Sequence, residues 1–227
     1  SLLQLRLPLR LLADFRNSTF HHDIVNELTT LKDEFRRARS IDVNTGSSRN
    51  PIWNVSPSTP QQYANYVDEI LRDYNDGSLL KWQPTIFCGN ITHKNTLVRH
   101  QIANCAMMID GVNKGSLSNR LIDAMHYKNV RDQIVPLIYR KLELKACVYC
   151  NANYTISDCD GEGYYDLDHW KPKSYYPFLC ISFFNLQPSC PSCNRRKSAS
   201  DTPFFGLWDD TGSRDLDVLK FKLDERS

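Results

Sequence analysis

The chain has 227 residues, 41% of them hydrophobic and 24% charged, and its formal net charge is +2. This length allows one large domain or two smaller ones, and so small a net charge does not by itself indicate a nucleic-acid-binding protein. A membrane-spanning helix needs about 18 or more consecutive apolar residues, and the sequence has no such run. We therefore expect a globular protein without a membrane partner.

Residues 1–140 predict a mainly α-helical region. Apolar residues recur there at three- and four-residue steps, the spacing of amphipathic helices. The segments with this spacing are residues 9–39, 61–75, 96–110, 117–127 and 130–145. Residues 40–61 are rich in Asn, Ser, Thr, Gly and Pro and predict an exposed loop. No motif in residues 1–140 indicates a chemistry, so we interpret this region as a partner-docking or regulatory part.

Four of the eight cysteines form two CxxC pairs, Cys147 with Cys150 and Cys190 with Cys193. A CxxC step lets two thiolates chelate one ion, and four thiolates bind Zn²⁺ tetrahedrally. With no open coordination position left, such a zinc ion would be structural. Disulfides, buried free cysteines and replacement of one ligand by Cys159 are the alternatives. Zinc-binding thiolates favour a reducing compartment, so we expect a cytoplasmic protein.

The segment between the two pairs predicts a hairpin. Residues 154–156 and 164–167 are β-rich and flank an Asp- and Gly-rich turn at 158–163. The second strand runs into Asp168 and His169, and a short helix is expected from Cys193.

The order of motifs in this segment resembles the HNH endonuclease family. After the first CxxC come Asp168-His169, a Pro-x-Ser step at 172–174 and Asn185, and then the second CxxC runs into Asn194-x-x-Lys197. The resemblance implies a ββα-metal fold, so we predict an α+β protein. Its mainly helical region would be followed by an HNH nuclease domain over residues 141–227 that contains the zinc site and a C-terminal extension.

The family resemblance also implies roles for single residues. Asp168 and Asn194 match ligands of a catalytic Mg²⁺ or Mn²⁺ ion, and His169 matches the general base. Asn185 matches a residue that holds the loop and orients the base without touching metal. The side chains expected to contact the nucleic-acid backbone are Lys171, Lys173, Arg195 and Lys197. Asp166, two residues before Asp168, is either a third carboxylate near the metal or a solvated strand residue.

The Asp-His-x-x-Pro-Lys-Ser-x-Tyr-Pro version of the motif is similar to the HNH subunits of Septu-type and retron-associated anti-phage systems. This similarity implies an effector nuclease that associates with an ATPase partner. DNA is the expected substrate and RNA the alternative. Two other interpretations remain: a catalytically silent, zinc-stabilised module that binds nucleic acid, and a structural zinc domain of an assembly.

Overall fold

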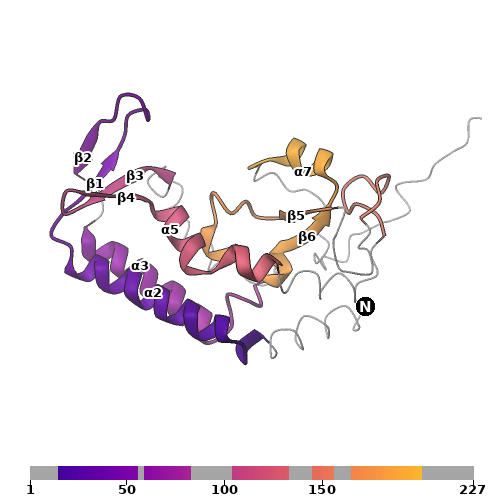
Figure 1. Cartoon of the computed structure of the whole chain (residues 1–227), viewed down its shortest axis with the longest axis horizontal. Helices are drawn as coiled ribbons and strands as arrows, with labels where there is room; N and C mark the ends of the chain where they lie inside the picture. The colour runs from indigo at the N-terminus through magenta and orange to yellow at the C-terminus, as the bar shows by residue number, and fades with distance from the viewer. Residues whose placement is uncertain (1–14, 56–58, 83–103, 133–144, 156–164, 201–227) are drawn as a thin grey trace, which may run out of the picture.

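The computed structural model describes residues 15–55, 59–82, 104–132, 145–155 and 165–200 (Figure 1). Two long helices, α2 (Thr19–Arg37) and α3 (Pro60–Asn75), lie side by side. The buried residues of α2 are Ile24, Leu28, Leu31 and Phe35, which form one stripe along the helix. Burial of each such side chain contributes about 1.5–3 kcal/mol. The predictions of helix in 9–39 and 61–75 are therefore confirmed for the residues that the structure describes.

The start of α3 is fixed by local sequence. Thr59 and Gln62 form a reciprocal capping box, in which each side chain accepts a hydrogen bond from the other residue's backbone N–H. Pro60 occupies the first turn, where its missing N–H costs no helical hydrogen bond. The Tyr63 ring of α3 stacks on Phe35 of α2, with 5.3 Å between the ring centroids. The Thr59–Gln62 capping box therefore sets the N-terminus of α3, and packing against α2 holds the helix in place.

A four-stranded antiparallel sheet lies at one end of these helices. It consists of β1 (Ile41–Asn44), β2 (Trp53–Val55), β3 (Ala106–Ile109) and β4 (Val112–Ser116), in the order β2-β1-β3-β4. The prediction of an exposed loop over 40–61 is wrong where β1 and β2 form. The prediction of a helix over 96–110 is wrong where the strand β3 forms, and residues 96–103 lie outside the described ranges.

The turn between β3 and β4 explains the second error. Asp110 and Gly111 both have positive φ, 50° and 80°, as a two-residue type I′ hairpin turn requires. Asp-Gly is a strong signal for that turn, and here it outweighs the helical spacing of the apolar residues before it. The Asp110 carboxylate also accepts hydrogen bonds from the backbone N–H groups of Arg39 and Ser40, at 2.8 and 3.0 Å. These bonds tie the turn to the segment that leads from α2 into β1.

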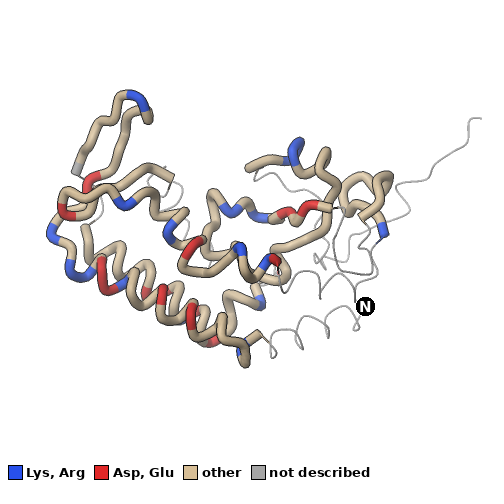
Figure 2. The backbone as a smooth tube through the Cα atoms, viewed as in Figure 1, with Lys and Arg blue, Asp and Glu red and all other residues tan. Residues whose placement is uncertain are grey.

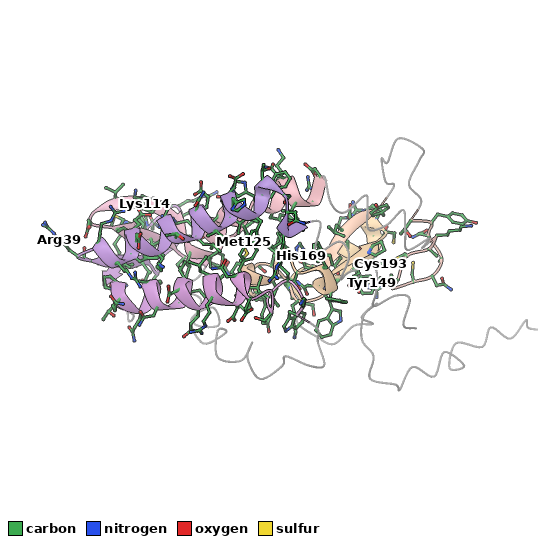
Figure 3. The ribbon with its side chains drawn as sticks, turned by 90° about the horizontal axis from the view of Figure 1, so that it is seen from below. Arg39, Lys114, Met125, Tyr149, His169 and Cys193 are labelled. Carbon is green, nitrogen blue, oxygen red and sulfur yellow. The ribbon has the colours of Figure 1, made fainter. Side chains whose placement is uncertain are left out.

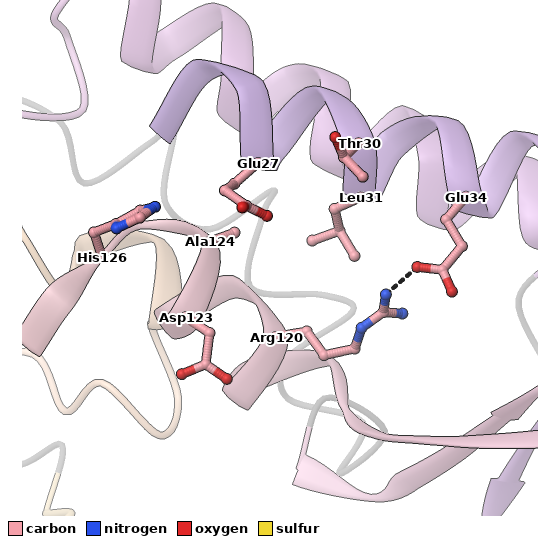
Figure 4. A pocket seen from close by; sticks show the side chains of 8 residues that line it. All are labelled: Glu27, Thr30, Leu31, Glu34, Arg120, Asp123, Ala124 and His126. Atoms are coloured by element: carbon pink, nitrogen blue, oxygen red, sulfur yellow. Dashed lines mark hydrogen bonds and ion pairs between the residues drawn. The ribbon is translucent and has the colours of Figure 1, made fainter. Parts of the chain in front are cut away.

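Helix α5 (Leu117–Ala124) follows β4 and confirms the helix predicted to start at 117. An ion pair joins its Arg120 to Glu34 of α2, and Lys114 reaches the same carboxylate at 3.2 Å. The Arg120 guanidinium also lies 5.4 Å from the centre of the Phe35 ring. Glu34 and Arg120 line a pocket of about 320 Å³ between α2 and α5 (Figure 4). Helix α5 is thereby fixed to α2, and it carries the chain toward the second half of the molecule.

That second half contains a strand–strand–helix unit. It comprises β5 (Asp166–His169), the 3-10 turns η2 (Pro177–Leu179) and η3 (Phe183–Asn185), β6 (Leu186–Ser189) and α7 (Pro191–Lys197). β5 forms where the sequence predicts a strand, but it pairs antiparallel with β6, downstream, for which no strand was predicted. Pro188 obscures β6 in the sequence, and it is tolerated because each strand of a two-stranded sheet is an edge strand. The turn predicted at 158–163 lies outside the described residues.

One hydrophobic core extends across the expected boundary near residue 140. It contains Phe15 and residues of α2, α3 and α5 together with residues 176–184. The Phe15 and Phe183 rings meet edge to face with centroids 5.9 Å apart, and the Cys180 thiol donates to Met125 Sδ at 3.7 Å. The position of the strand–strand–helix unit is thus fixed by the N-terminal helices. Among the described residues, no helix is both long and apolar enough to cross a membrane.

Candidate functional site

The four predicted cysteines lie together. Cys147 and Cys150 lie in a turn, Cys190 caps α7 and Cys193 lies in its first turn. Their four sulphur atoms all lie within 4.8 Å of one another. Zn–S bonds of about 2.3 Å in a tetrahedron place the sulphurs about 3.8 Å apart, so the cluster fits a structural zinc ion. Cys159, the alternative ligand, lies outside the described residues.

Hydrogen bonds favour the thiolate form that binds metal at Cys150 and Cys190, whereas burial and hydrogen bonds with Cys190 and Cys150 raise the pKa of Cys193 to about 12. Burial raises the pKa of Cys190, but hydrogen bonds from the Asn153 amide, at 3.2 Å, and from Cys193 outweigh it and lower the pKa to about 6. Backbone N–H groups of Ala152 and Asn153 lower the pKa of Cys150.

Asp168 is a buried carboxylate, 5% exposed, near the middle of the site. It accepts a hydrogen bond from the Tyr149 hydroxyl, and the Lys197 ammonium lies 3.3 and 3.2 Å from its two oxygens. Burial raises the pKa of Asp168, and both partners oppose that rise. Lys197 also donates to the backbone carbonyl of His169 at 2.7 Å. Figure 2 shows the acidic residues of β5 with basic residues on the loop that follows and on α7.

His169 points to the opposite face of β5 from Asp168, as successive strand residues do. Its Nε2 lies 3.0 Å from the carbonyl oxygen of Cys180, and its ring lies 5.1 Å from that of Tyr127. Since a carbonyl can only accept, Nε2 carries the proton. Burial lowers the pKa of His169 to about 3, so the ring is neutral at pH 7. Figure 3 shows His169 between Met125 on one side and Tyr149 and Cys193 on the other.

This lowered pKa predicts an acid-sensitive fold. The ordinary pKa of His is 6.5, so between about pH 6.5 and 3 the unfolded chain binds a proton that the folded chain excludes. Stability therefore falls as the pH falls through that window, by up to about 1.4 kcal/mol per pH unit. Urea unfolding at several pH values should show a shallower pH dependence for His169→Gln than for the wild type. Equal slopes for the two proteins would contradict the buried neutral ring.

Asn194 and Asp166 meet across β5 and α7. The Asn194 amide donates to the Asp166 carboxylate at 2.9 Å. Asp166 and Asp168 alternate along the strand and project to one face, and Asn194 and Lys197 are one helical turn apart. The unit therefore gathers two carboxylates, an amide and an ammonium in one place. In the described part of the chain, the Asn194 side chain bonds through its amide nitrogen and not through its oxygen.

Asn185 is completely buried, and among the described residues its side chain bonds to backbone groups only. Its oxygen accepts from the Lys171 N–H at 2.7 Å, and its amide donates to the carbonyls of Lys171 and Leu179, each at 3.1 Å. These bonds hold together the loop between β5 and β6. His169 directly precedes this loop, so Asn185 helps to fix where β5 ends.

The four basic residues proposed for backbone contacts have different surroundings. Arg195 is exposed on α7, whereas Lys197 is 3% exposed and bound to Asp168. Lys171 lies over the rings of Trp170 and Tyr176, at 5.0 and 5.2 Å. Lys173 lies 4.4 Å from the centre of the Tyr127 ring, and burial lowers its pKa.

The sequence did not single out three residues that contact the site. Tyr149 bonds to Asp168, Tyr127 packs on His169, and Gln187 donates to the Tyr149 hydroxyl. Tyr149 carried a signal, because it lies inside the first CxxC pair. Tyr127 and Gln187 carried none, since their positions depend on tertiary packing and on the β5–β6 register.

Comparison with known proteins gives one distant relationship. A stretch of 92 residues is 28% identical to Septu protein PtuB of Bacillus thuringiensis, and the match covers 39% of this chain and 34% of that protein. No protein-family model and no solved structure matches the chain. The protein, with its four-cysteine cluster beside a strand–strand–helix unit, is thus distantly similar to a Septu protein.

Proposed function

We propose that this protein is a metal-dependent endonuclease of the HNH type, which hydrolyses phosphodiester bonds in nucleic acid as part of a bacterial anti-phage defence system. One observation carries the proposal: the β5–β6–α7 unit gathers Asp168, His169 and Asn194 beside a four-cysteine cluster. The same unit provides a base and oxygen ligands, the two requirements for hydrolysis of a phosphodiester with metal assistance.

His169 is the general base. Its Nε2–H is held by the Cys180 carbonyl, which fixes the tautomer and leaves the Nδ1 lone pair to accept a proton from water. Among the described residues, none is hydrogen-bonded to Nδ1. The negative charge of a bound phosphate beside the ring would raise the pKa of His169 from about 3 toward the range of an effective base. Because β5 ends at His169, a phosphate at this end of the strand would have the base on one side and Asp168 on the other.

Asp168 and Asn194 would hold the catalytic cation, with Asp166 as a further oxygen donor. Carboxylate and amide oxygens are hard ligands and suit Mg²⁺ or Mn²⁺. When bound, such an ion supplies Lewis-acid stabilisation of the charge that develops on the phosphate. Lys197, which neutralises Asp168 in this structure, keeps the buried carboxylate compensated in the absence of the ion.

DNA is the proposed substrate, and RNA is the alternative. The exposed Arg195 and the half-buried Lys171 and Lys173 flank the site and could contact backbone phosphates. The similarity to Septu protein PtuB supports the defence role. An ATPase partner is proposed on the family resemblance, and residues 1–140 are the proposed docking and regulatory part.

Cleavage assays test this proposal. Zinc-loaded protein is incubated with supercoiled plasmid or end-labelled RNA in Mg²⁺, Mn²⁺ or EDTA. We expect cleavage that requires the divalent ion, is lost in Asp168→Asn and is retained in Asp123→Asn, a control at an exposed carboxylate on α5. Metal-independent cutting, or equal cutting by Asp168→Asn, would contradict the proposal.

The second candidate function is a zinc-stabilised binding module without hydrolysis. It is favoured by the burial of Asp168 and His169, which are 5% and 6% exposed. A binding module of this kind should retard DNA in a gel without cutting it, with or without an ATPase partner.

A further inference from the structure

A tyrosine inside the first cysteine pair contacts the proposed catalytic carboxylate directly. Tyr149 lies between Cys147 and Cys150, and its hydroxyl donates a hydrogen bond to Oδ2 of Asp168. Gln187 donates to the same hydroxyl from β6. Asp168 and Gln187 lie directly opposite each other in the β5–β6 register. The hydroxyl of a residue in the zinc-binding turn is therefore held against a cross-strand pair at the centre of the site.

The second cysteine pair reaches the same carboxylate by another route. Cys190 caps α7 and Cys193 lies in its first turn. Lys197 follows Cys193 by four residues, on the same face of the helix, and its ammonium lies 3.2 Å from Asp168 Oδ2. Tyr149 and Lys197, whose side chains both contact the Asp168 carboxylate, are thus attached to the four-cysteine cluster, one through each pair.

The two partners do different things to the carboxylate. Lys197 supplies charge, which a buried carboxylate needs. Tyr149 sets the orientation of the carboxylate, because a single O–H donor held by Gln187 favours one rotation of the carboxylate group. Groups that hydrogen-bond a metal ligand in this way orient it, and their loss typically lowers metal affinity about 10- to 100-fold.

We propose that Tyr149 is a positioning residue that couples the four-cysteine zinc site to the Asp168 carboxylate, so that a closed zinc site sets the orientation in which Asp168 binds the divalent ion. This inference rests on the proposed function, since it concerns the same divalent-ion site. It gives the zinc site a role in the metal affinity of its neighbour in addition to its role in the fold.

The test is Mn²⁺ binding to the full chain without nucleic acid. Free Mn²⁺ is followed by its electron paramagnetic resonance signal during titration of zinc-loaded wild type, Asp168→Asn, Tyr149→Phe and Tyr154→Phe. Tyr154 is 72% exposed in the same segment and is the matched control. Zinc content and urea unfolding are measured for each protein.

We expect Tyr149→Phe to bind Mn²⁺ about 10- to 100-fold more weakly than the wild type, with zinc content unchanged, and Tyr154→Phe to match the wild type. If Tyr149→Phe binds Mn²⁺ as tightly as the wild type while Asp168→Asn does not bind it, the positioning role is overturned and the proposed function stands. Equal Mn²⁺ binding by the wild type and Asp168→Asn overturns both. If Tyr149→Phe loses zinc, Gln187→Leu makes the same test without altering either cysteine pair, and unchanged affinity there overturns the inference.

Discussion

Replacement of Cys190 by Ser is expected to unfold the strand–strand–helix unit. Cys190 is both a member of the four-sulphur cluster and the N-cap of α7, and the cluster joins α7 to the turn at 147–150. Structural zinc sites contribute roughly 10–16 kcal/mol of apparent binding free energy, which is available only to the folded chain. Loss of the zinc ion therefore removes most or all of the free energy of unfolding of a typical domain, which is about 5–15 kcal/mol.

Zinc content and amide hydrogen exchange measure this effect. We expect about one zinc ion per chain in the wild type, loss of that ion in Cys190→Ser and rapid exchange in β5, β6 and α7. A strong chelator should have the same effect on the wild type. Cys105→Ser, at a cysteine outside the cluster, is the control and should keep both zinc and protection. A zinc-free Cys190→Ser protein with wild-type protection would contradict the structural role of the cluster.

The second large effect is expected from Lys197→Met. Lys197 is 3% exposed, and its ammonium contacts the buried Asp168 carboxylate and the His169 carbonyl. Methionine keeps the length of the side chain but leaves the carboxylate without its counter-charge. Removal of one member of a buried ion pair typically costs about 3–5 kcal/mol. Urea unfolding of the zinc-loaded protein should show a loss of this size.

A double-mutant cycle separates the charge from the packing. Asp168→Asn combined with Lys197→Met removes both charges, and the double variant is expected to be more stable than Lys197→Met alone, because no uncompensated charge is left. Arg196→Met is the control on the same helix, since Arg196 is exposed and should tolerate the change within about 0.5 kcal/mol. A Lys197→Met protein as stable as Arg196→Met would show that the ammonium does not stabilise Asp168.

Features that depend on local sequence were predictable. The apolar spacing over residues 61–75 predicted α3, and the two CxxC pairs predicted four sulphur atoms close in space. In each case residues a few positions apart set the geometry, so the linear spacing carries the information.

Features that depend on distant pairing were not predictable in the same way. β6 contains Pro188, and its identity as a strand comes from its pairing with β5. Two groups from distant parts of the chain contact His169. The Cys180 carbonyl comes from the loop between β5 and β6, and the Tyr127 ring comes from the segment after α5. The Asp110-Gly111 turn is the exception, because its type I′ signal was present in the sequence and indicated a hairpin. The catalytic roles of Asp168, His169, Asn185 and Asn194 stay predictions.

The most direct measurement of the central claim is the single-turnover rate of plasmid cleavage by zinc-loaded wild type and His169→Ala in Mg²⁺ or Mn²⁺, with any ATPase partner present. A positioned general base typically contributes about 10²- to 10⁴-fold, so the variant should cut at least about 100-fold more slowly. His22→Ala, at an exposed histidine on α2, is the matched control and should cut at the wild-type rate. Cleavage by His169→Ala at the wild-type rate, with zinc content and fold intact, would falsify the assignment of His169 as the base and with it the HNH mechanism.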